Sequence, residues 1–360
     1  MSPPDCANHP TTARPNADIT GIGISLAWLI TAGLALSLVI ASYFIAYRPD
    51  FNPFTLENTG LQSERGSYLK SNPIDYLFLK WRLRKATVQV SAEAELQSNR
   101  IREALTLCML TMSDYQLITG LAVLISAYSQ LNSGISTLQW DRVIDLAWFS
   151  SITHLCCLTF LRDYFVQNKR AQIWRISGMI VLVILLVVAL VPSSRYSLRS
   201  GYRAVSGVNP TKKEVYDLSS DYAYCFFKPC REGSRPTYFL ENKEDILNKK
   251  QNVMISAAIL IIGIVNRIWR LYETSTRFYI IARGWISRHI KRLLRWTLNA
   301  TQSKSFMLVA LLYRPILACY LVCHLILDVV LSKAFEVYWL TIGFFWGLIN
   351  LIGVQEPDDQ

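Results

Sequence analysis

The chain has 360 residues with a mean hydropathy of +0.24, and 52% of the residues are hydrophobic. The apolar residues gather into runs of about 20, the length that spans the hydrocarbon core of a bilayer, so an ordinary soluble domain is excluded. The formal net charge of +11 does not indicate nucleic acid, because nearly all Lys and Arg residues lie between the apolar runs. In a membrane protein that placement reports orientation and contact with anionic lipid.

The order of these runs predicts an all-α integral membrane protein, a bundle of about seven transmembrane helices. We expect these spans at Gly21–Tyr47, Tyr115–Leu131, Val143–Leu161, Trp174–Val191, Asn252–Asn266, Phe306–Leu331 and Phe335–Leu351. The predicted division is a disordered tail at 1–20, helices one to four at 21–192 with a cytosolic interfacial helix near 92–110, a polar loop at 193–251, helices five to seven at 252–353, and an acidic tail at 354–360.

The distribution of Lys and Arg predicts the orientation. The N-terminal tail holds one such residue and the first connection nine, and the following connections alternate in the same sense. The N-terminus is therefore expected outside or in the lumen, and the C-terminus in the cytosol. The loop at 193–251 breaks the alternation, but long loops translocate largely regardless of their charge.

Two cysteines in that loop form the pattern CFFKPC, at Cys225 and Cys230. With no His nearby and only two thiols, a closed zinc site is not expected. A small disulfide loop is the favoured interpretation, because this loop faces the oxidising side of the membrane. Two unpaired thiols are the alternative.

The segment 267–304 is strongly basic, with Trp, Phe, Ile and Leu residues threaded through it. This mixture is typical of an amphipathic helix that lies on an anionic membrane surface. An ordinary cytosolic loop helix is the alternative.

The third predicted span carries Asp145 and His154, and ionisable groups inside a span are costly and usually functional. The two residues are nine positions apart, so they point to roughly opposite sides of the helix. Each needs partners from other helices.

The seven-span topology brings Asp145, His324, Asp328 and Glu336 toward the outer mouth of the bundle. Crowded carboxylates in a medium of low dielectric keep one of them protonated near neutral pH. Such an acid could protonate an epoxide or an alkene, with Trp148 stabilising a carbocation. Asp145 and Asp328 are the candidate catalytic acids, with His324 as orienting group or base. The alternative is that these groups pair with one another and only orient helices.

Three further residues are candidates for binding substrate: His154, Trp148 and Arg314. Arg314 could hold a phosphate or carboxylate of the substrate, or it could pair with Asp114. No DDxxD metal-diphosphate motif in a membrane-facing position and no phosphate-binding loop occur, the seventh span has no Lys for a retinal Schiff base, and the chain has only four His. We therefore expect no cofactor and no metal site.

Three motifs resemble a known family: SDYQLITGLAVLI at Ser113–Ile125, LAWFSSITHL at Leu146–Leu155 and LTFLRDY at Leu158–Tyr164. They are similar to a family of integral membrane proteins of filamentous fungi, some of which are encoded in secondary-metabolite clusters, including indole-diterpene clusters. The resemblance implies a fungal host and terpenoid metabolism, and it assigns no catalytic residue.

The leading hypothesis is a membrane-bound terpenoid cyclase of fungal secondary metabolism, or an accessory to one. A non-enzymatic receptor or scaffold and a metabolite transporter are the alternatives. The expected partners are the lipid bilayer, a hydrophobic small molecule and other enzymes of a biosynthetic cluster, and the expected location is the endoplasmic reticulum or another endomembrane.

Overall fold

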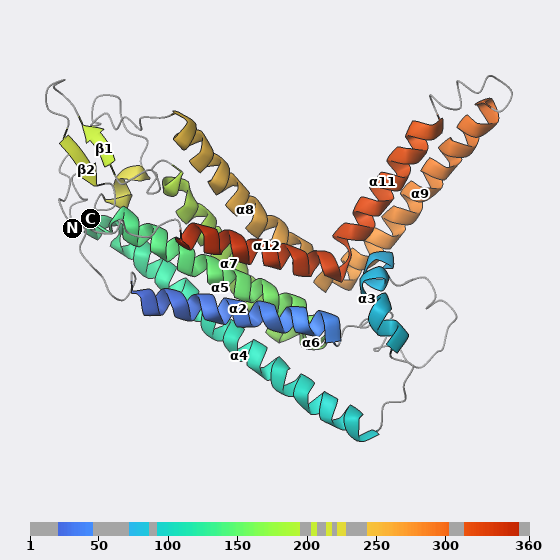
Figure 1. The fold of residues 1–360 in the computed structure, drawn as a ribbon, viewed down its shortest axis with the longest axis horizontal. Helices are drawn as coiled ribbons and strands as arrows, with labels where there is room; N and C mark the ends of the chain where they lie inside the picture. Colours follow the sequence, from blue (N-terminus) through green and yellow to red (C-terminus); the bar gives the residue numbers. More distant parts are fainter. Residues whose placement is uncertain are drawn as a thin grey trace.

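The computed structural model describes residues 21–45, 72–85, 92–194, 203–206, 214–217, 222–227, 243–301 and 313–352. Apart from one short antiparallel hairpin, these residues are almost entirely helical (Figure 1). The predicted tails at 1–20 and 354–360 and most of the loop at 193–251 lie outside the described residues.

Six described helices are long and apolar enough to cross a membrane, which identifies a multi-pass membrane architecture. They belong to α2 (Ile22–Ile45), α4 (Ala92–Gln130), α5 (Thr137–Phe160), α7 (Lys169–Ser193), α8 (Lys243–Leu271) and α12 (Lys333–Ile352). The other elements are α3 (Pro73–Lys85), η3 (Leu131–Ser133), α6 (Arg162–Gln167), β1 (Arg203–Ser206), β2 (Glu214–Asp217), η5 (Ala223–Phe226), α9 (Glu273–Thr301) and α11 (Arg314–Val330).

The predicted sixth span, Phe306–Leu331, is not among these six. Its described part is α11, which has only 17 residues and begins at Arg314, with Pro315 in the first turn. Proline suits the first turn of a helix, which fits the start of α11 at Arg314. α11 packs beside α9, and the two form an arm that leaves the bundle transversely (Figure 1).

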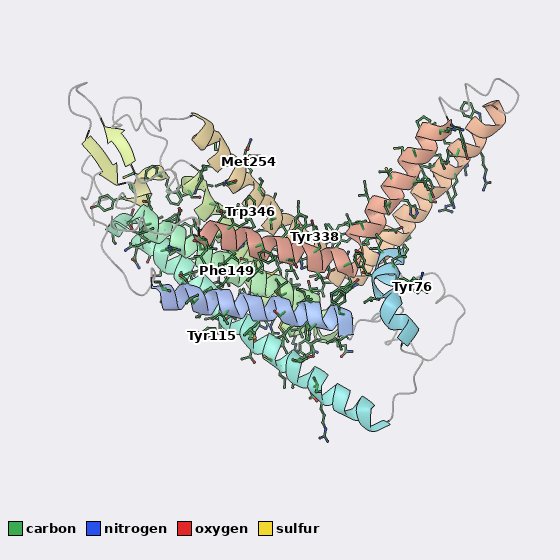
Figure 2. All side chains as sticks on the ribbon, viewed as in Figure 1. Tyr76, Tyr115, Phe149, Met254, Tyr338 and Trp346 are labelled. Atoms are coloured by element: carbon green, nitrogen blue, oxygen red, sulfur yellow. The ribbon has the colours of Figure 1, made fainter. Side chains whose placement is uncertain are left out.

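Helix α5 is the centre of the bundle and contacts α2, α4, α7, α8 and α12. Of its most apolar 18 residues, 94% are buried, against 28% for both α2 and α12. Phe149 of α5 lies inside the bundle, whereas Tyr115 of α4 and Tyr338 of α12 point outward (Figure 2). The candidate spans therefore differ in how much surface they expose: the other helices shield α5, whereas α2 and α12 are largely exposed.

The start of α5 is fixed by a capping box. Ser136 accepts from the Gln139 backbone N–H, and the Gln139 side chain accepts from the Ser136 backbone N–H, so two otherwise unpaired donors are satisfied. Just before it, Gly134 has φ of 95°, a left-handed conformation that favours glycine. The helix therefore begins at Thr137, six residues before the predicted start at Val143.

The bundle has two distinct ends, which we name by their neighbours. The loop end is where α5 begins, beside η5, and the arm end is where α12 begins, beside α9 and α11 (Figure 1). Arg142 near the start of α5 donates to the Leu351 carbonyl oxygen, whereas Lys333 at the start of α12 donates to the Thr159 carbonyl oxygen. α12 thus runs antiparallel to α5.

The same antiparallel relation holds between α2 and α12. Tyr43 near the end of α2 and Lys333 at the start of α12 both bond to Asp75 of α3. The start of α2 and the end of α12 therefore lie at the same end of the bundle. The seven-span prediction placed the two ends of the chain on opposite sides; the number of crossings and the orientation of the two ends stay predictions.

Glycines let α12 approach α5 closely. Gly343 and Gly347 are four residues apart, the small-xxx-small spacing that brings membrane helices together. A Cβ atom at Gly343 would lie 2.8 Å from Ile152 Cδ1, and one at Gly347 would overlap the indole of Trp148. Gly347 therefore needs a residue without a side chain, because the rigid indole cannot move aside as the flexible end of Ile152 can.

We expect Gly347→Ala to destabilise the bundle by about 1–3 kcal/mol, the usual effect of overpacking. Gly23→Ala is the matched control, because nothing lies within 4 Å of a Cβ atom there. Thermal denaturation of both variants in detergent, followed by size-exclusion chromatography, measures the difference. Equal melting temperatures would show that α12 does not pack on Trp148.

Candidate functional site

A small pocket lies at the loop end between α5, α7, α8 and α12. Its polar lining comes from Asp141, Asp145, Ser193, Lys249, Asn252, Ser256 and Asn350.

Asp141 and Asp145 give the pocket its acid character. They are four residues apart on one face of α5, and the residues are only 6% and 8% exposed. Lys249 of α8 lines the same pocket. The sequence prediction singled out Asp145 alone and left Asp141 in a loop, because it began the helix at Val143. The capping box at Ser136 was the signal that would have placed Asp141 in the helix.

Trp148 forms the apolar wall of the pocket one turn further along α5. Its Nε1 donates to the Gly343 carbonyl oxygen at 3.0 Å, and Gly347 lies directly against the indole. A second tryptophan, Trp346, donates from Nε1 to Ser256 Oγ at 2.8 Å. The ring and the hydroxyl group that line the pocket are therefore held in fixed positions by α12.

His154 does not line this pocket. It is buried at 2% exposure, where Ser113 Oγ of α4 lies 3.0 Å from its Nδ1. Its Nε2 makes no hydrogen bond with any described residue. As the spacing predicted, it lies on the other side of α5 from Asp145, and its part in substrate binding stays a prediction.

Asp114 and Arg175 form an ion pair beside this histidine. Arg175 Nε and Nη2 of α7 donate to the two carboxylate oxygens of Asp114, each at 2.7 Å. The proposed pairing of Asp114 with Arg314 is therefore wrong, since Arg314 lies at the start of α11 in the arm. Within the SDYQ motif, Ser113 bonds α4 to α5 and Asp114 bonds α4 to α7.

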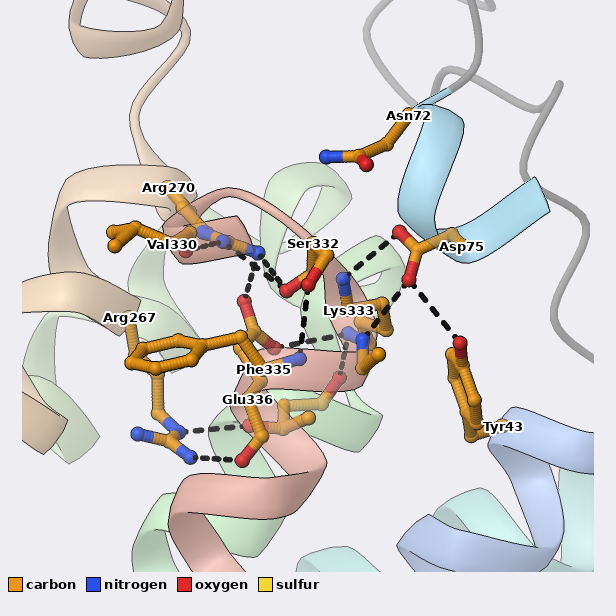
Figure 3. A network of polar contacts seen from close by, with 12 residues as sticks. Tyr43, Asn72, Asp75, Arg267, Arg270, Val330, Ser332, Lys333, Phe335 and Glu336 are labelled. Carbon is orange, nitrogen blue, oxygen red and sulfur yellow. Dashed lines mark hydrogen bonds and ion pairs between the residues drawn. The ribbon is translucent and has the colours of Figure 1, made fainter. Parts of the chain in front are cut away.

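The arm end contains a second polar network, centred on Glu336 of α12 (Figure 3). Arg270 Nη1 of α8 donates to Glu336 Oε1 at 2.6 Å, and Lys333 Nζ lies 3.4 Å from Glu336 Oε2. The Glu336 side chain is only 3% exposed and that of Arg270 is 7% exposed. Arg270 also donates to the carbonyl oxygens of Val330 and Ser332.

Two more residues extend this network. Arg267 donates to Thr159 Oγ1 at 2.8 Å and to the Glu336 carbonyl oxygen at 3.1 Å. Asp75 of α3 accepts from the backbone N–H groups of Lys333 and Ala334, both at 2.9 Å, and so caps the start of α12 (Figure 3). The sequence assigned Arg267 and Arg270 to an exposed basic segment, because their partner Glu336 is 66 or more positions away.

The predicted convergence of Asp145, His324, Asp328 and Glu336 is wrong. His324 Nδ1 lies 3.3 Å from Asp328 Oδ2 on α11, and the Asp328 carbonyl oxygen accepts from Asn72 at the arm end. Glu336 lies at the same end, whereas Asp145 lies at the loop end. The physical reason is that α12 begins at the arm end and runs antiparallel to α5, whereas the prediction had the two helices parallel.

The structure bears in part on the predicted disulfide. Cys225 in η5 is disulfide-bonded. Cys230 lies outside the described residues, so the pairing of these two cysteines stays a prediction.

Comparisons with protein-family models, with curated proteins and with solved structures gave no match to this chain. Among the described residues, no group of three or more His, Cys, Asp or Glu side chains could hold a metal ion. The candidate site therefore rests on its geometry: a pocket with two carboxylates, an amine and a fixed indole.

We expect Glu336→Gln to lower stability by about 3–5 kcal/mol, because it leaves Arg270 and Lys333 buried without their counter-charge. Glu103→Gln is the matched control, since Glu103 is an exposed residue of α4. The melting temperature of each purified variant in detergent is the measurement. If Glu336→Gln has the same melting temperature as Glu103→Gln and the parent protein, the network does not hold α8 on α12.

Proposed function

We propose that this chain acts in fungal secondary metabolism as a membrane-bound, acid-catalysed cyclase of a terpenoid, or as an accessory to one. The observation that carries the proposal is the loop-end pocket, where Asp141 and Asp145 face the same space as the indole of Trp148. The family resemblance supports the terpenoid class of substrate. Only the reacting end of such a substrate would enter this small pocket, while the rest of its chain stays in lipid.

In the proposed step, protonated Asp145 gives its proton to an epoxide oxygen or to an alkene carbon of the substrate. Opening of the C–O bond, or loss of the π bond, leaves a carbocation that Trp148 stabilises by cation–π contact. A second π bond attacks this cation and closes a ring. The Asp141 carboxylate then accepts a C–H proton, and transfer of that proton to Asp145 restores the pair. The net change is an isomerisation, so no oxidant or reductant is needed.

We further propose that the arm end faces the cytosol and the loop end faces the lumen. Long connections do not count on either side, because they translocate largely regardless of their charge. The short connection at the arm end carries Arg162, Lys169 and Arg170, whereas the short connection 131–136 at the loop end carries no Lys or Arg. At the loop end, residues 1–21 carry one and residues 353–360 carry none. The positive-inside rule places the richer side in the cytosol. Both ends of the chain are then lumenal, and the pocket opens toward the lumen of the endoplasmic reticulum or another endomembrane.

An accessory role is the second form of this proposal. In that case the pocket binds the terpenoid intermediate and presents it to other enzymes of the same pathway, without proton transfer by Asp145. A receptor or scaffold is a different function. The polar contacts Ser113–His154 and Asp114–Arg175 favour it, because they fix the helices in one arrangement. A transporter requires helices that move past one another, and these polar contacts disfavour such movement.

We expect Asp145→Asn to lower product formation by about 100-fold or more, since a general acid contributes roughly 10²–10⁴ to a rate. Asp328→Asn is the matched control, because the structure places that carboxylate at the arm end. The measurement is mass spectrometry of cells and medium from a gene-deletion strain that expresses each variant at the parental level.

The outcomes separate the candidate functions. Loss of product with Asp145→Asn alone, with an uncyclised precursor accumulating, supports the cyclase. If deletion of the gene blocks synthesis and both variants restore the full amount of product, the result supports the accessory role. An unchanged metabolite profile after deletion of the gene would contradict both forms, and retention of finished product inside cells would favour the transporter.

A further inference from the structure

The α9–α11 arm exposes an unusual amount of apolar surface for a segment outside the bundle. α9 and α11 lie side by side, and Ser287 Oγ is 2.9 Å from Tyr320 Oη between them. On α9, large apolar side chains remain exposed, including Trp285 at 56% and Trp296 at 67%. On α11, Leu321, Val322, Leu325 and Ile326 are each more than half exposed. Contiguous apolar surface of this kind marks a binding face for lipid or protein.

A strip of positive charge runs beside this apolar face. Arg288, Lys291, Arg292 and Arg295 are all exposed on α9. At 100° per residue, they lie on the side of the helix next to Trp285 and Trp296. No Asp or Glu occurs between Glu273 and Asp328, a stretch with eight Lys and Arg residues. The face therefore suits an anionic surface and repels a cationic one.

The place of the arm in the fold decides between lipid and other anionic partners. It leaves the bundle at the arm end, where α8, α9 and α12 meet, and runs across the direction of the membrane-spanning helices (Figure 1). A helix hairpin that is transverse to a transmembrane bundle, at one end of it, lies along the plane of the membrane surface. Its apolar side chains then reach the acyl chains, and its basic side chains reach the headgroups.

We propose that the α9–α11 arm is an in-plane membrane anchor that binds anionic phospholipid headgroups through Arg288, Lys291, Arg292 and Arg295. Trp285, Trp296 and the apolar face of α11 enter the acyl boundary beneath them. The cytosolic assignment of the arm end, where anionic lipids are concentrated, agrees with this proposal. The lipid contact itself does not depend on the catalytic role of Asp145.

Two native cysteines report on the arm directly. Cys319 and Cys323 are exposed on α11, on the same face as Val322 and Ile326. When the arm lies on the bilayer, a water-soluble maleimide cannot reach them. The full chain is therefore reconstituted in nanodiscs of phosphatidylcholine, with or without 30% phosphatidylserine, and the alkylation rate of each cysteine is measured by peptide mass spectrometry.

We expect phosphatidylserine to slow alkylation of Cys319 and Cys323 by about tenfold or more. Changing Arg288, Lys291, Arg292 and Arg295 to Gln together should abolish this difference between the lipids. The matched control changes four exposed basic residues at the same end of the bundle to Gln: Lys80, Arg100, Lys169 and Arg170. This control should keep the full lipid effect.

Three results would overturn the proposal. Equal alkylation rates in the two lipid compositions would show that the arm does not bind anionic headgroups. A lipid effect that both quadruple variants lose equally would show an effect of net charge alone. Protection in detergent that rises with protein concentration would assign the face to a second copy of the chain. Because a nanodisc presents both membrane surfaces, an error in the proposed orientation would leave this readout unchanged.

Discussion

The rest of the bundle depends on the burial of α5. This helix is apolar enough to span a bilayer, yet it carries Asp141, Asp145, Ser150, Thr153 and His154. Lipid cannot hydrogen-bond such groups, so they are stable only when other helices enclose them. Five helices do so, and three of them contribute a specific hydrogen-bond partner: Ser113 from α4 to His154, the carbonyl oxygen of Gly343 from α12 to Trp148, and Arg267 from α8 to Thr159 near the end of α5. The polar content of one span thus determines how its neighbours are arranged.

The sequence was informative where the signal is local. Apolar runs located all six candidate spans, and the polar residues of the third predicted helix identified it as the one that other helices must surround. It failed where the outcome depends on distant residues. α12 runs antiparallel to α5, a direction that no local signal reveals, and this separates Glu336 and Asp328 from Asp145. Likewise, nothing near Arg267 or Arg270 in the sequence reveals that both are buried beside Glu336.

The two ends of the bundle consequently have different characters. At the arm end, charged groups are paired with one another: Arg270 with Glu336, and Asp75 with the first backbone N–H groups of α12. Such groups fix the geometry of the arm end. At the loop end, Asp141 and Asp145 line a space that a ligand could enter. The pocket is the reason for assigning the proposed chemistry to the loop end, and the exposed apolar and basic surface is the reason for assigning the membrane contact to the α9–α11 arm.

The number of crossings decides on which side of the membrane each end of the chain lies. It is tested most directly by glycosylation reporters fused in turn to the N-terminus and the C-terminus, in an Asn299→Gln background that removes the native acceptor site at Asn299-Ala300-Thr301. Six crossings with the arm end in the cytosol predict that both reporters are glycosylated and that endoglycosidase H shifts both. Glycosylation at the N-terminus without glycosylation at the C-terminus would require an odd number of crossings. It would place the two ends of the chain on opposite sides and contradict the antiparallel relation described for α2 and α12.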